Sequence, residues 1–353
     1  IGGQIDGPDG LFYSDKEKLE SLGAQVNMET KVKDVDFEGK TITVQQKDGS
    51  EIQESYDKLI LASGSWPIIP KIPGVGLKNV QLVKLYQHAA DVIEKIKSPD
   101  IKNITIVGAG YIGVELAEAF QRNGKNTTLI DVAETCLSSY YDEDFRNLMR
   151  KNLEDHGINV VFGEKLTEIR GTEQVEEVVT EKNTYKADMV VLCIGFAPNT
   201  ELGGGKIERY KNGAYLVNKK QETSVKDVYA IGDCCTVYDN SIEAPDYIAL
   251  ATNAVRSGIV AAHNVCGTGL ESAGVQGSNG ICIYDLKMVS SGLTMDNTKN
   301  LGIDALATDY EDLQKPEFIR SNNPSVKLRI VYDAKTRVIL GAQMASTYDM
   351  TMG

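Results

Sequence analysis

Three glycines in a GxGxxG pattern, Gly108, Gly110 and Gly113, have the type and spacing that suit dinucleotide binding. They follow the apolar run 104–107, which predicts a buried strand, and they introduce residues 111–122, which predict a helix. In such a turn the first glycine permits the tight bend, the second lets the backbone approach a pyrophosphate, and the third lets helix and strand pack closely. The free N–H groups of the helix N-terminus would then face the phosphates, so the pattern predicts a dinucleotide site.

An acidic residue follows at the position that this kind of site requires. A second predicted strand, residues 127–130, ends in Asp131, and an acid there accepts hydrogen bonds from the adenosine ribose hydroxyls. The next residues, Val132, Ala133 and Glu134, offer no cation to receive a 2′-phosphate. The sequence therefore predicts NADH rather than NADPH; the alternative is a glycine turn that serves packing alone.

A second nucleotide signal lies at Gly232 and Asp233, where an apolar strand ends just before a helix predicted over residues 247–265. An acid at the carboxyl end of a strand in an α/β sheet is placed to bind the hydroxyl groups of a ligand. Two other apolar strands, within 59–62 and 190–195, end in small-residue turns with proline beyond. Such turns bring backbone close to a ligand or carry the chain between domains, although each alone could be an ordinary strand end.

Length and composition are typical of a multidomain globular protein. The chain has 353 residues, more than one ordinary core, and 42% of them are hydrophobic. A net charge of −13 argues against a nucleic acid or an anionic membrane surface as partner. No apolar run is long enough to span a bilayer and no signal peptide opens the chain, so a cytoplasmic location is expected. The six cysteines and three histidines lack metal-ligand spacing, so no metal site is expected.

Local patterns predict several further elements. Ser14 and Glu17 form a capping-box pattern that opens a short helix closing near Gly23. Alternating or apolar runs predict strands over residues 32–35, 41–44, 51–53, 280–284 and 328–332. The last two are apolar and need a covering partner, which is either the core of the chain itself or a second subunit.

Three motifs stand in chain order around these elements. They are LILASGS from Leu59 to Ser65, CIGFAPNTEL from Cys193 to Leu202, and VYAIGDC from Val228 to Cys234. Together they resemble the two domain-crossing motifs and the flavin-ribityl motif of the flavin-dependent pyridine-nucleotide disulfide oxidoreductases. Two further segments, Gly10 to Ala24 and Ile248 to Asn264, narrow the resemblance to the branch of NADH oxidases, NADH peroxidases and coenzyme A-disulfide reductases.

The resemblance spans essentially the whole chain and implies an α/β fold with two Rossmann-like nucleotide-binding domains. An FAD-binding domain, residues 1–76 and 199–266, would be interrupted by an NAD-binding domain, residues 77–198. Residues 267–353 would form a C-terminal α+β dimerisation domain, which makes a homodimer the expected assembly.

Both ends of the chain are expected to be incomplete. The FAD phosphate loop and the single redox cysteine of the family lie upstream of the residues that match Ile1, and the terminal segment of the family lies beyond Gly353. The N-terminal βαβ unit of the FAD domain would therefore be missing. The role of the redox cysteine passes to none of the six cysteines present, and the neighbours Cys234 and Cys235 are expected to pack between a strand and a helix.

The same resemblance implies which residues contact each nucleotide. For FAD they are Ser63, Gly64, Lys84, Asp233, Ala251 and Thr252, with Asp233 on the ribityl chain. Ala251 and Thr252 would meet the pyrimidine edge at a helix N-terminus, which stabilises negative charge. For NADH they are Gly108, Gly110, Tyr111, Ile112, Gly113, Glu115, Asp131, Tyr140 and Gly195. Tyr111, as an aromatic gate over the nicotinamide face of the flavin, and Glu115, in the nicotinamide pocket, are the catalytic candidates; the alternative is ordinary helix surface.

The implied reaction has two halves. NADH passes a hydride to FAD, and the electrons continue to dioxygen, which takes four of them, from two NADH, to form water. The alternatives are an NADH peroxidase or a coenzyme A-disulfide reductase and, from another class, a non-catalytic NAD-binding fragment.

Overall fold

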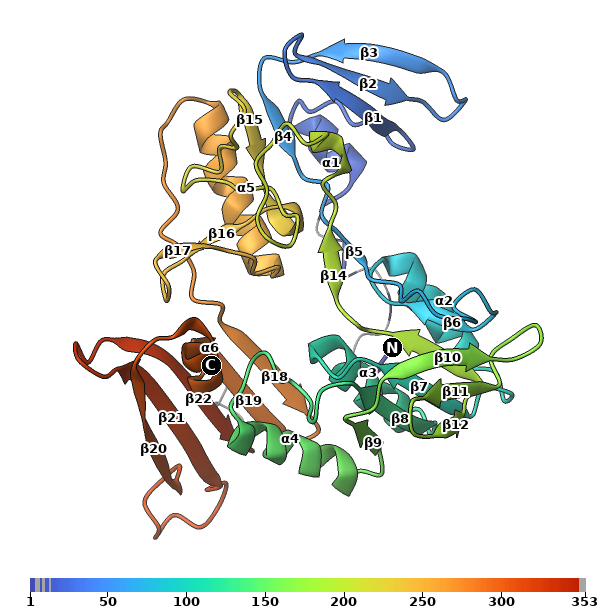
Figure 1. The fold of residues 1–353 in the computed structure, drawn as a ribbon, viewed down its shortest axis with the longest axis vertical. Helices are drawn as coiled ribbons and strands as arrows, with labels where there is room; N and C mark the ends of the chain where they lie inside the picture. Colours follow the sequence, from blue (N-terminus) through green and yellow to red (C-terminus); the bar gives the residue numbers. More distant parts are fainter. Residues whose placement is uncertain (4–6, 8–9, 13, 349–353) are drawn as a thin grey trace. The chain divides into compact units, whose positions relative to one another are not determined.

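A computed structural model describes residues 1–3, 7, 10–12 and 14–348 of the chain, which divides into two compact units (Figure 1). Unit 1 comprises residues 1–3, 67–196 and 276–353, and unit 2 comprises residues 4–66 and 197–275. Two of the points at which the chain passes from one unit to the other lie in short strands that pair with each other, β5 (Ser65–Pro67) and β14 (Phe196–Pro198). Within the described residues, no helix has the length and apolar character needed to cross a membrane.

The centre of unit 1 is a parallel five-stranded sheet with the order β6-β13-β7-β8-β9. Its strands are β6 (Val80–Leu82), β7 (Asn103–Val107), β8 (Asn126–Asp131), β9 (Asn159–Phe162) and β13 (Met189–Leu192), and the helices of this part are α2 (Tyr86–Ile96), α3 (Tyr111–Arg122) and α4 (Glu143–Asp155). Every residue of β13 is buried, as expected of a strand covered on both faces. The predicted strand, glycine turn, helix and strand are confirmed. A small antiparallel sheet of β10 (Leu166–Arg170), β11 (Glu177–Thr180) and β12 (Thr184–Lys186) accompanies them.

The C-terminal part of unit 1 is an antiparallel sheet with the order β18-β19-β22-β21-β20. Its elements are β18 (Asn279–Ile283), β19 (Leu286–Gly292), α6 (Met295–Leu301), β20 (Ala305–Leu313), β21 (Ser325–Asp333) and β22 (Ile339–Ser346). The strands predicted over 280–284 and 328–332 are confirmed. Because side chains alternate along a strand, one face of this sheet can pack inward while the other stays uncovered.

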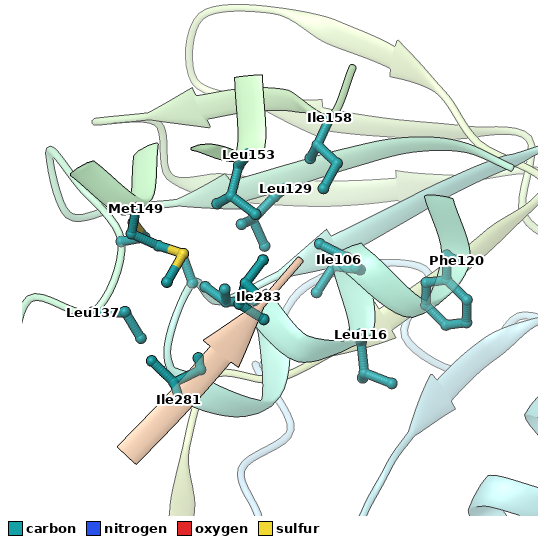
Figure 2. Close-up of a cluster of buried hydrophobic side chains, with 14 of the residues drawn as sticks. Ile106, Leu116, Phe120, Leu129, Leu137, Met149, Leu153, Ile158, Ile281 and Ile283 are labelled. Carbon is teal, nitrogen blue, oxygen red and sulfur yellow. The ribbon is translucent and has the colours of Figure 1, made fainter. Parts of the chain in front are cut away.

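The inward face of this sheet joins the hydrophobic core beside the parallel sheet. Ile281 and Ile283 of β18 lie in one buried cluster with Leu137, Met149 and Leu153, all at most 1% exposed (Figure 2). Burial of a side chain of this size stabilises a fold by roughly 1.5–3 kcal/mol. The two sheets of unit 1 therefore share one core rather than folding around separate ones.

A buried carboxylate fixes the same junction. Asp142 stands at the N-cap of α4, but its side chain does not cap that helix. It accepts hydrogen bonds from the backbone N–H groups of Met295 and Asp296 at the start of α6, both at 3.2 Å, and from Nε2 of Gln343 at 2.7 Å. The backbone N–H of Asp142 donates to Oε1 of Gln343 at 2.7 Å, and Nη1 of Arg329 lies 3.4 Å from the carboxylate. A buried charge with this many partners stabilises one arrangement of the junction.

A second contact lies between the helices of the parallel-sheet part and the β18–β19 turn. The ring of Tyr284 stacks on His156, with the ring centres 3.5 Å apart, while the Arg122 guanidinium lies over the Tyr284 ring at 4.9 Å. The backbone N–H of Tyr284 donates to Glu118, and its hydroxyl donates to Oε1 of Gln121 at 2.9 Å. Polar and aromatic contacts thus reinforce the shared core.

Unit 2 is built from small sheets and two helices. Its elements are α1 (Lys16–Ser21), β1 (Lys31–Asp36), β2 (Thr41–Gln45), β3 (Glu51–Ser55), β4 (Leu59–Leu61), η1 (Glu201–Gly203), β15 (Val228–Ala230), η2 (Gly232–Cys234), β16 (Val237–Asp239), β17 (Ala244–Asp246) and α5 (Ala251–Val265). Strands β1, β2 and β3 form an antiparallel sheet, β4 pairs with β15 in parallel, and β16 pairs with β17. The strands predicted over 32–35, 41–44, 51–53 and 59–62 are confirmed.

Two predicted helix starts are wrong by a few residues. The first helix is capped by Asp15 rather than Ser14, because the Asp15 carboxylate accepts from the backbone N–H of Lys18 at 2.7 Å. The helix predicted from residue 247 begins at Ala251, because its N-cap Leu250 still has extended backbone.

Replacement of Asp142 by alanine is expected to lower the free energy of unfolding by about 3 kcal/mol or more, because it leaves Gln343 and the start of α6 without their acceptor. The control is Asp144→Ala. Asp144 also pairs with Arg329, but its side chain is 49% exposed, so the expected loss is at most about 1 kcal/mol. Chemical denaturation of both variants measures the difference; equal losses would contradict the role given to the buried carboxylate.

Candidate functional site

The glycine turn of unit 1 requires glycine on steric grounds at two of its three positions. Gly108 follows β7 with a φ of +107°, and a Cβ there would collide with the carbonyl of Cys193. A Cβ on Gly113 would collide with the carbonyl of Gly108. Gly110, the N-cap of α3, has no atom within 4 Å of the position a Cβ would take. The turn is thus closely packed on its inner side and open where a pyrophosphate would approach the helix N-terminus.

Asp131 ends β8 beside this turn. Its Oδ2 accepts the backbone N–H of Ala109 at 2.6 Å, and its Oδ1 accepts the N–H of Ala133 at 2.8 Å. These two bonds hold the half-buried carboxylate against the glycine turn. Val132 next to it is 67% exposed, so a substituent on the ribose would meet a carboxylate and an apolar side chain rather than a cation. This arrangement suits NADH and disfavours a 2′-phosphate.

Tyr111, the first residue of α3, lies in a cluster of tyrosines. Its ring packs edge-on against Tyr140, with the ring centres 4.5 Å apart, and its hydroxyl lies 2.9 Å from the hydroxyl of Tyr141. Desolvation raises the pKa of the Tyr111 phenol well above its usual range, so the phenol stays neutral at physiological pH. Two predicted NADH residues, Tyr111 and Tyr140, are therefore in contact. The helical spacing puts Ile112 on the neighbouring face, half-buried against the core.

Glu115 lies one helical turn after Tyr111, so both side chains are on one face of α3. The residue is exposed to solvent. Desolvation of its carboxyl by surrounding atoms, followed by repulsion from Glu118, raises its pKa. The Glu115 carboxyl is therefore protonated more readily than usual. Because it lies on the face of α3 that begins at the dinucleotide turn, it can hold a proton beside a bound ligand.

The end of β13 approaches the same turn. The carbonyl of Cys193 lies against Gly108. Two residues further along, Gly195 has a φ of +103°. The Gly195 carbonyl accepts the backbone N–H of Ile68 at 3.0 Å. Burial raises the pKa of the Cys193 thiol to about 12, so it is a neutral packing group. Gly195 is thus positioned in unit 1, as are the glycine turn, Asp131 and the tyrosines.

Lys84, predicted to lie near the flavin, is also in unit 1. Its ammonium lies 4.6 Å from the ring centre of Phe196, a cation–π contact. Phe196 directly follows Gly195 at the start of β14, one of the two strands that lead to unit 2. The described contacts give Lys84 an aromatic partner and leave its place beside a flavin a prediction.

In unit 2 the predicted flavin aspartate lies at the carboxyl ends of β4 and β15. Oδ2 of Asp233 accepts a hydrogen bond from the Ser65 hydroxyl at 2.9 Å, and its backbone carbonyl accepts from the Tyr247 hydroxyl at 3.0 Å. Gly232, with a φ of +69°, donates its N–H to Oγ of Ser257 on α5 at 3.0 Å. The turn is thereby tied to the helix that follows it, and the aspartate has a fixed orientation.

The two crossing motifs meet in unit 2. The Ser63 hydroxyl donates to the backbone carbonyl of Asn199, and the carbonyl of Gly64 accepts the N–H of Asn199 at 2.9 Å. Gly64 has a φ of +68°, which favours glycine. Segments that lie more than a hundred residues apart in the sequence thus form one turn-to-turn contact.

The N-terminus of α5 has the features of an anion-stabilising site. Ala251 and Thr252 are both exposed, and the N-cap residue Leu250 offers no side-chain acceptor. The backbone N–H groups of the first turn receive no hydrogen bond acceptor from the N-cap side chain, so they can donate to a ligand. The dipole of this 15-residue helix favours negative charge at the same end. With Asp233, Ser63 and Gly64 in the same unit, these donors and acceptors fit a bound flavin.

Several contacts were missed by sequence reasoning. The Tyr141 hydroxyl contacts that of the predicted NADH residue Tyr111, and Ser65 and Tyr247 hold Asp233. No spacing pattern could reveal them, since each pair is brought together by the fold.

Two neighbouring cysteines lie in the core of unit 2. Cys234 and Cys235 are 0% and 3% exposed and belong to the core of unit 2, in agreement with the packing role expected for them. Within the described part of the chain, no group of three His, Cys, Asp or Glu side chains is arranged to hold a metal ion.

Comparison with known proteins shows the family to which the chain is related. The family model "Pyridine nucleotide-disulphide oxidoreductase" matches residues 3–258. An NADH oxidase of Streptococcus pyogenes is 59% identical, over 100% of this chain and 80% of its own length, and one of Lactococcus lactis is 47% identical with the same coverage. The structure of a water-forming NADH oxidase from Lactobacillus brevis bound to NADH is similar with a TM-score of 0.96 and 40% identity, over 99% of this chain and 78% of that one.

These comparisons confirm the resemblance and the fold class predicted from the motifs. The segments that suggested the branch of NADH oxidases belong to a chain similar throughout to the water-forming NADH oxidases of lactic-acid bacteria. The assignment of individual site residues stays a prediction.

The surroundings of Asp131 predict how cofactor preference can be changed. The double variant Asp131→Ala with Val132→Arg removes a negative charge and adds a guanidinium for a 2′-phosphate. The ratio of kcat/KM for NADPH to that for NADH is expected to rise by on the order of 100-fold. The control, Asp131→Ala with Val132→Gln, should weaken NADH without a gain for NADPH. A gain in the control equal to that of the arginine variant would contradict the assignment of this loop to the ribose.

Proposed function

The chain belongs to the pyridine nucleotide-disulphide oxidoreductase family, and from that premise we propose that it is an NADH oxidase that reduces dioxygen to water. As a member of this family it is an FAD-dependent oxidoreductase that uses NADH. The observation that carries the proposal is the glycine turn of unit 1, with Asp131 held against it and Tyr111 at the start of the helix. Dioxygen as acceptor and water as product are supported by the oxidases to which the chain is similar.

On this proposal the parts of NADH are bound by different residues of unit 1. The N–H groups at the start of α3, beside Gly108, Gly110 and Gly113, bind the pyrophosphate. The carboxylate of Asp131 binds the adenosine ribose. The nicotinamide end is lined by Tyr111, Ile112, Glu115, Tyr140 and Gly195. The neutral phenol of Tyr111 offers an aromatic ring edge without charge, which suits an uncharged dihydronicotinamide.

FAD is assigned to residues of unit 2 together with Lys84. Asp233 binds the ribityl hydroxyls, Ser63 and Gly64 contact the cofactor near the crossing, and the N-terminus of α5 at Ala251 and Thr252 stabilises negative charge on the pyrimidine edge. FAD, when bound, supplies the relay between a two-electron donor and dioxygen. The residues of the chain orient the two nucleotides and set the charge around them.

We assign the domains as the motifs suggested: FAD binding to residues 1–76 and 199–266, NADH binding to 77–198 and dimerisation to 267–353. Unit 1 combines the second with most of the third, because they share a core. We place the protein in the cytoplasm, because its six free thiols suit a reducing compartment.

A homodimer is supported by the outward face of the C-terminal sheet. Along β21 the side chains of Leu328, Ile330 and Tyr332 share this face, which is opposite to the fully buried Val331. In register beside them on β20 lie Leu306 and Tyr310, 43% and 56% exposed. An uncovered apolar sheet face of this kind is typical of an interface between subunits, and a two-fold axis would pair it with itself.

The proposed reaction predicts a stoichiometry. The flavin-loaded enzyme should consume one O2 for every two NADH, because reduction of dioxygen to water takes four electrons and NADH carries two. An oxygen electrode and NADH absorbance, read together, measure the ratio, and addition of catalase should release no oxygen. Oxygen release on catalase addition would indicate peroxide as product, and absence of oxygen uptake would favour a peroxidase or a coenzyme A-disulfide reductase. A preparation that binds NADH but no flavin would favour an NAD-binding module.

The proposed interface predicts the effect of a charge on it. Ile330→Arg places two arginines near the two-fold axis of the dimer and should shift the protein to monomers in light scattering coupled to gel filtration. Ile52→Arg, at a 37% exposed strand position of β3 in unit 2, is the control and should leave the mass unchanged. A dimer that persists in Ile330→Arg would place the interface elsewhere.

A further inference from the structure

The hydroxyl of Tyr111 is held by a residue that the predicted site does not include. Tyr141 lies 30 positions further along the chain, and the two phenol oxygens are 2.9 Å apart. Tyr141 is 0% exposed, and burial raises its pKa to about 12, so both phenols are neutral and can share one hydrogen bond. Ser290 on β19, 8% exposed, lies close enough to both phenols to oppose the rise in their pKa that burial causes.

The C-terminal sheet fixes this cluster from one side. Ser290 on β19 is paired in register with Gln343 on β22. These two neighbours lie beside two consecutive residues of the loop before α4. Ser290 is close to the Tyr141 phenol, and Gln343 bonds both the backbone and the side chain of Asp142. Tyr141 therefore has no freedom to follow Tyr111 if the ring of Tyr111 moves.

We propose that Tyr141 is a positioning residue: its hydroxyl, anchored by the C-terminal sheet, holds the ring of Tyr111 in the place that the nicotinamide must enter. This inference rests on the proposed function, in which Tyr111 lies over the nicotinamide face of the flavin. The ring of Tyr111 has to turn away to admit the nicotinamide, and it then gives up its bond to Tyr141. The free energy of NADH binding is thereby reduced by the free energy of the Tyr111–Tyr141 hydrogen bond. When no nicotinamide is bound, the ring of Tyr111 covers the site.

The direction of the effect follows from the burial of the pair. With Tyr141→Phe the closed position of Tyr111 loses a partner, whereas the open position, where water solvates the phenol, is unchanged. Both NADH and NAD⁺ should bind about five-fold more tightly, the equivalent of ~1 kcal/mol for one hydrogen bond. The rate of flavin reduction at saturating NADH should stay within about two-fold, because Tyr141 does not touch the reacting atoms.

The test uses two readouts on the flavin-loaded enzyme. Isothermal titration calorimetry with NAD⁺ gives a Kd without turnover, and anaerobic stopped-flow absorbance gives the Kd for NADH and the limiting rate of flavin reduction. Tyr111→Phe, Tyr141→Phe and the double variant form a cycle. Since each single change removes the same bond, the double variant should bind no more tightly than either single one.

A matched control is available at the same junction. Tyr284→Phe also deletes a phenol hydroxyl with one hydrogen bond, to Gln121, but away from Tyr111. It should leave both Kd values unchanged, and Ser290→Ala should tighten binding less than Tyr141→Phe. Thermal unfolding of each variant reports whether the fold is kept.

The outcomes separate this inference from the proposed function. Tighter NAD⁺ binding in Tyr141→Phe, non-additive with Tyr111→Phe, supports the inference even in a protein that consumes no oxygen. Unchanged or weaker binding in Tyr141→Phe, in an enzyme that oxidises NADH normally, overturns the inference alone. An equal effect of Tyr284→Phe also overturns it, because general loosening of the junction would then explain the result.

Discussion

The arrangement of unit 1 depends on the buried carboxylate of Asp142. A charge removed from water is costly unless its acceptor positions are filled, and here Gln343, Arg329 and the first N–H groups of α6 fill them. The third N–H of α6, that of Asn297, is capped by Thr294, so the start of this helix has no buried donor left over. One side chain therefore joins the loop before α4, the helix α6 and the C-terminal sheet.

This constraint extends to the predicted nicotinamide site. Tyr140 and Tyr141 directly precede Asp142, so the contacts that fix the carboxylate also fix the two tyrosines that touch Tyr111. The inward face of an antiparallel sheet thereby sets the position of a ring at the N-terminus of a helix from the parallel sheet. The C-terminal sheet, to which we assign a role in dimerisation, thus also shapes the predicted site within its own chain.

The C-terminal sheet serves both roles because side chains alternate along its strands. Val331 and Gln343 point to the core and are 0% and 2% exposed, whereas Leu306 and Tyr310 on the other face remain uncovered. A one-residue change of register would exchange the two faces, so the pairing of Ser290 with Gln343 is decisive for both. The same hydrogen-bonded register that places Ser290 and Gln343 beside Tyr141 and Asp142 also leaves uncovered the apolar face on which the proposed dimer rests.

The sequence by itself determined the features whose physical cause is local. Apolar runs gave the strands β7, β8 and β4, and the spacing of Gly108, Gly110 and Gly113 located the turn. At Gly108 and Gly113 only glycine tolerates the close backbone contacts. The tertiary structure decided the rest. The start of α5 at Ala251 was not fixed by the local pattern, and the contacts of Tyr141 with Tyr111 and of Asp142 with Gln343 join segments 30 and 201 positions apart. The hydrophobic periodicity of the sequence cannot predict such contacts. It shows which face of a helix or strand is buried, but not which residue of another element that face contacts.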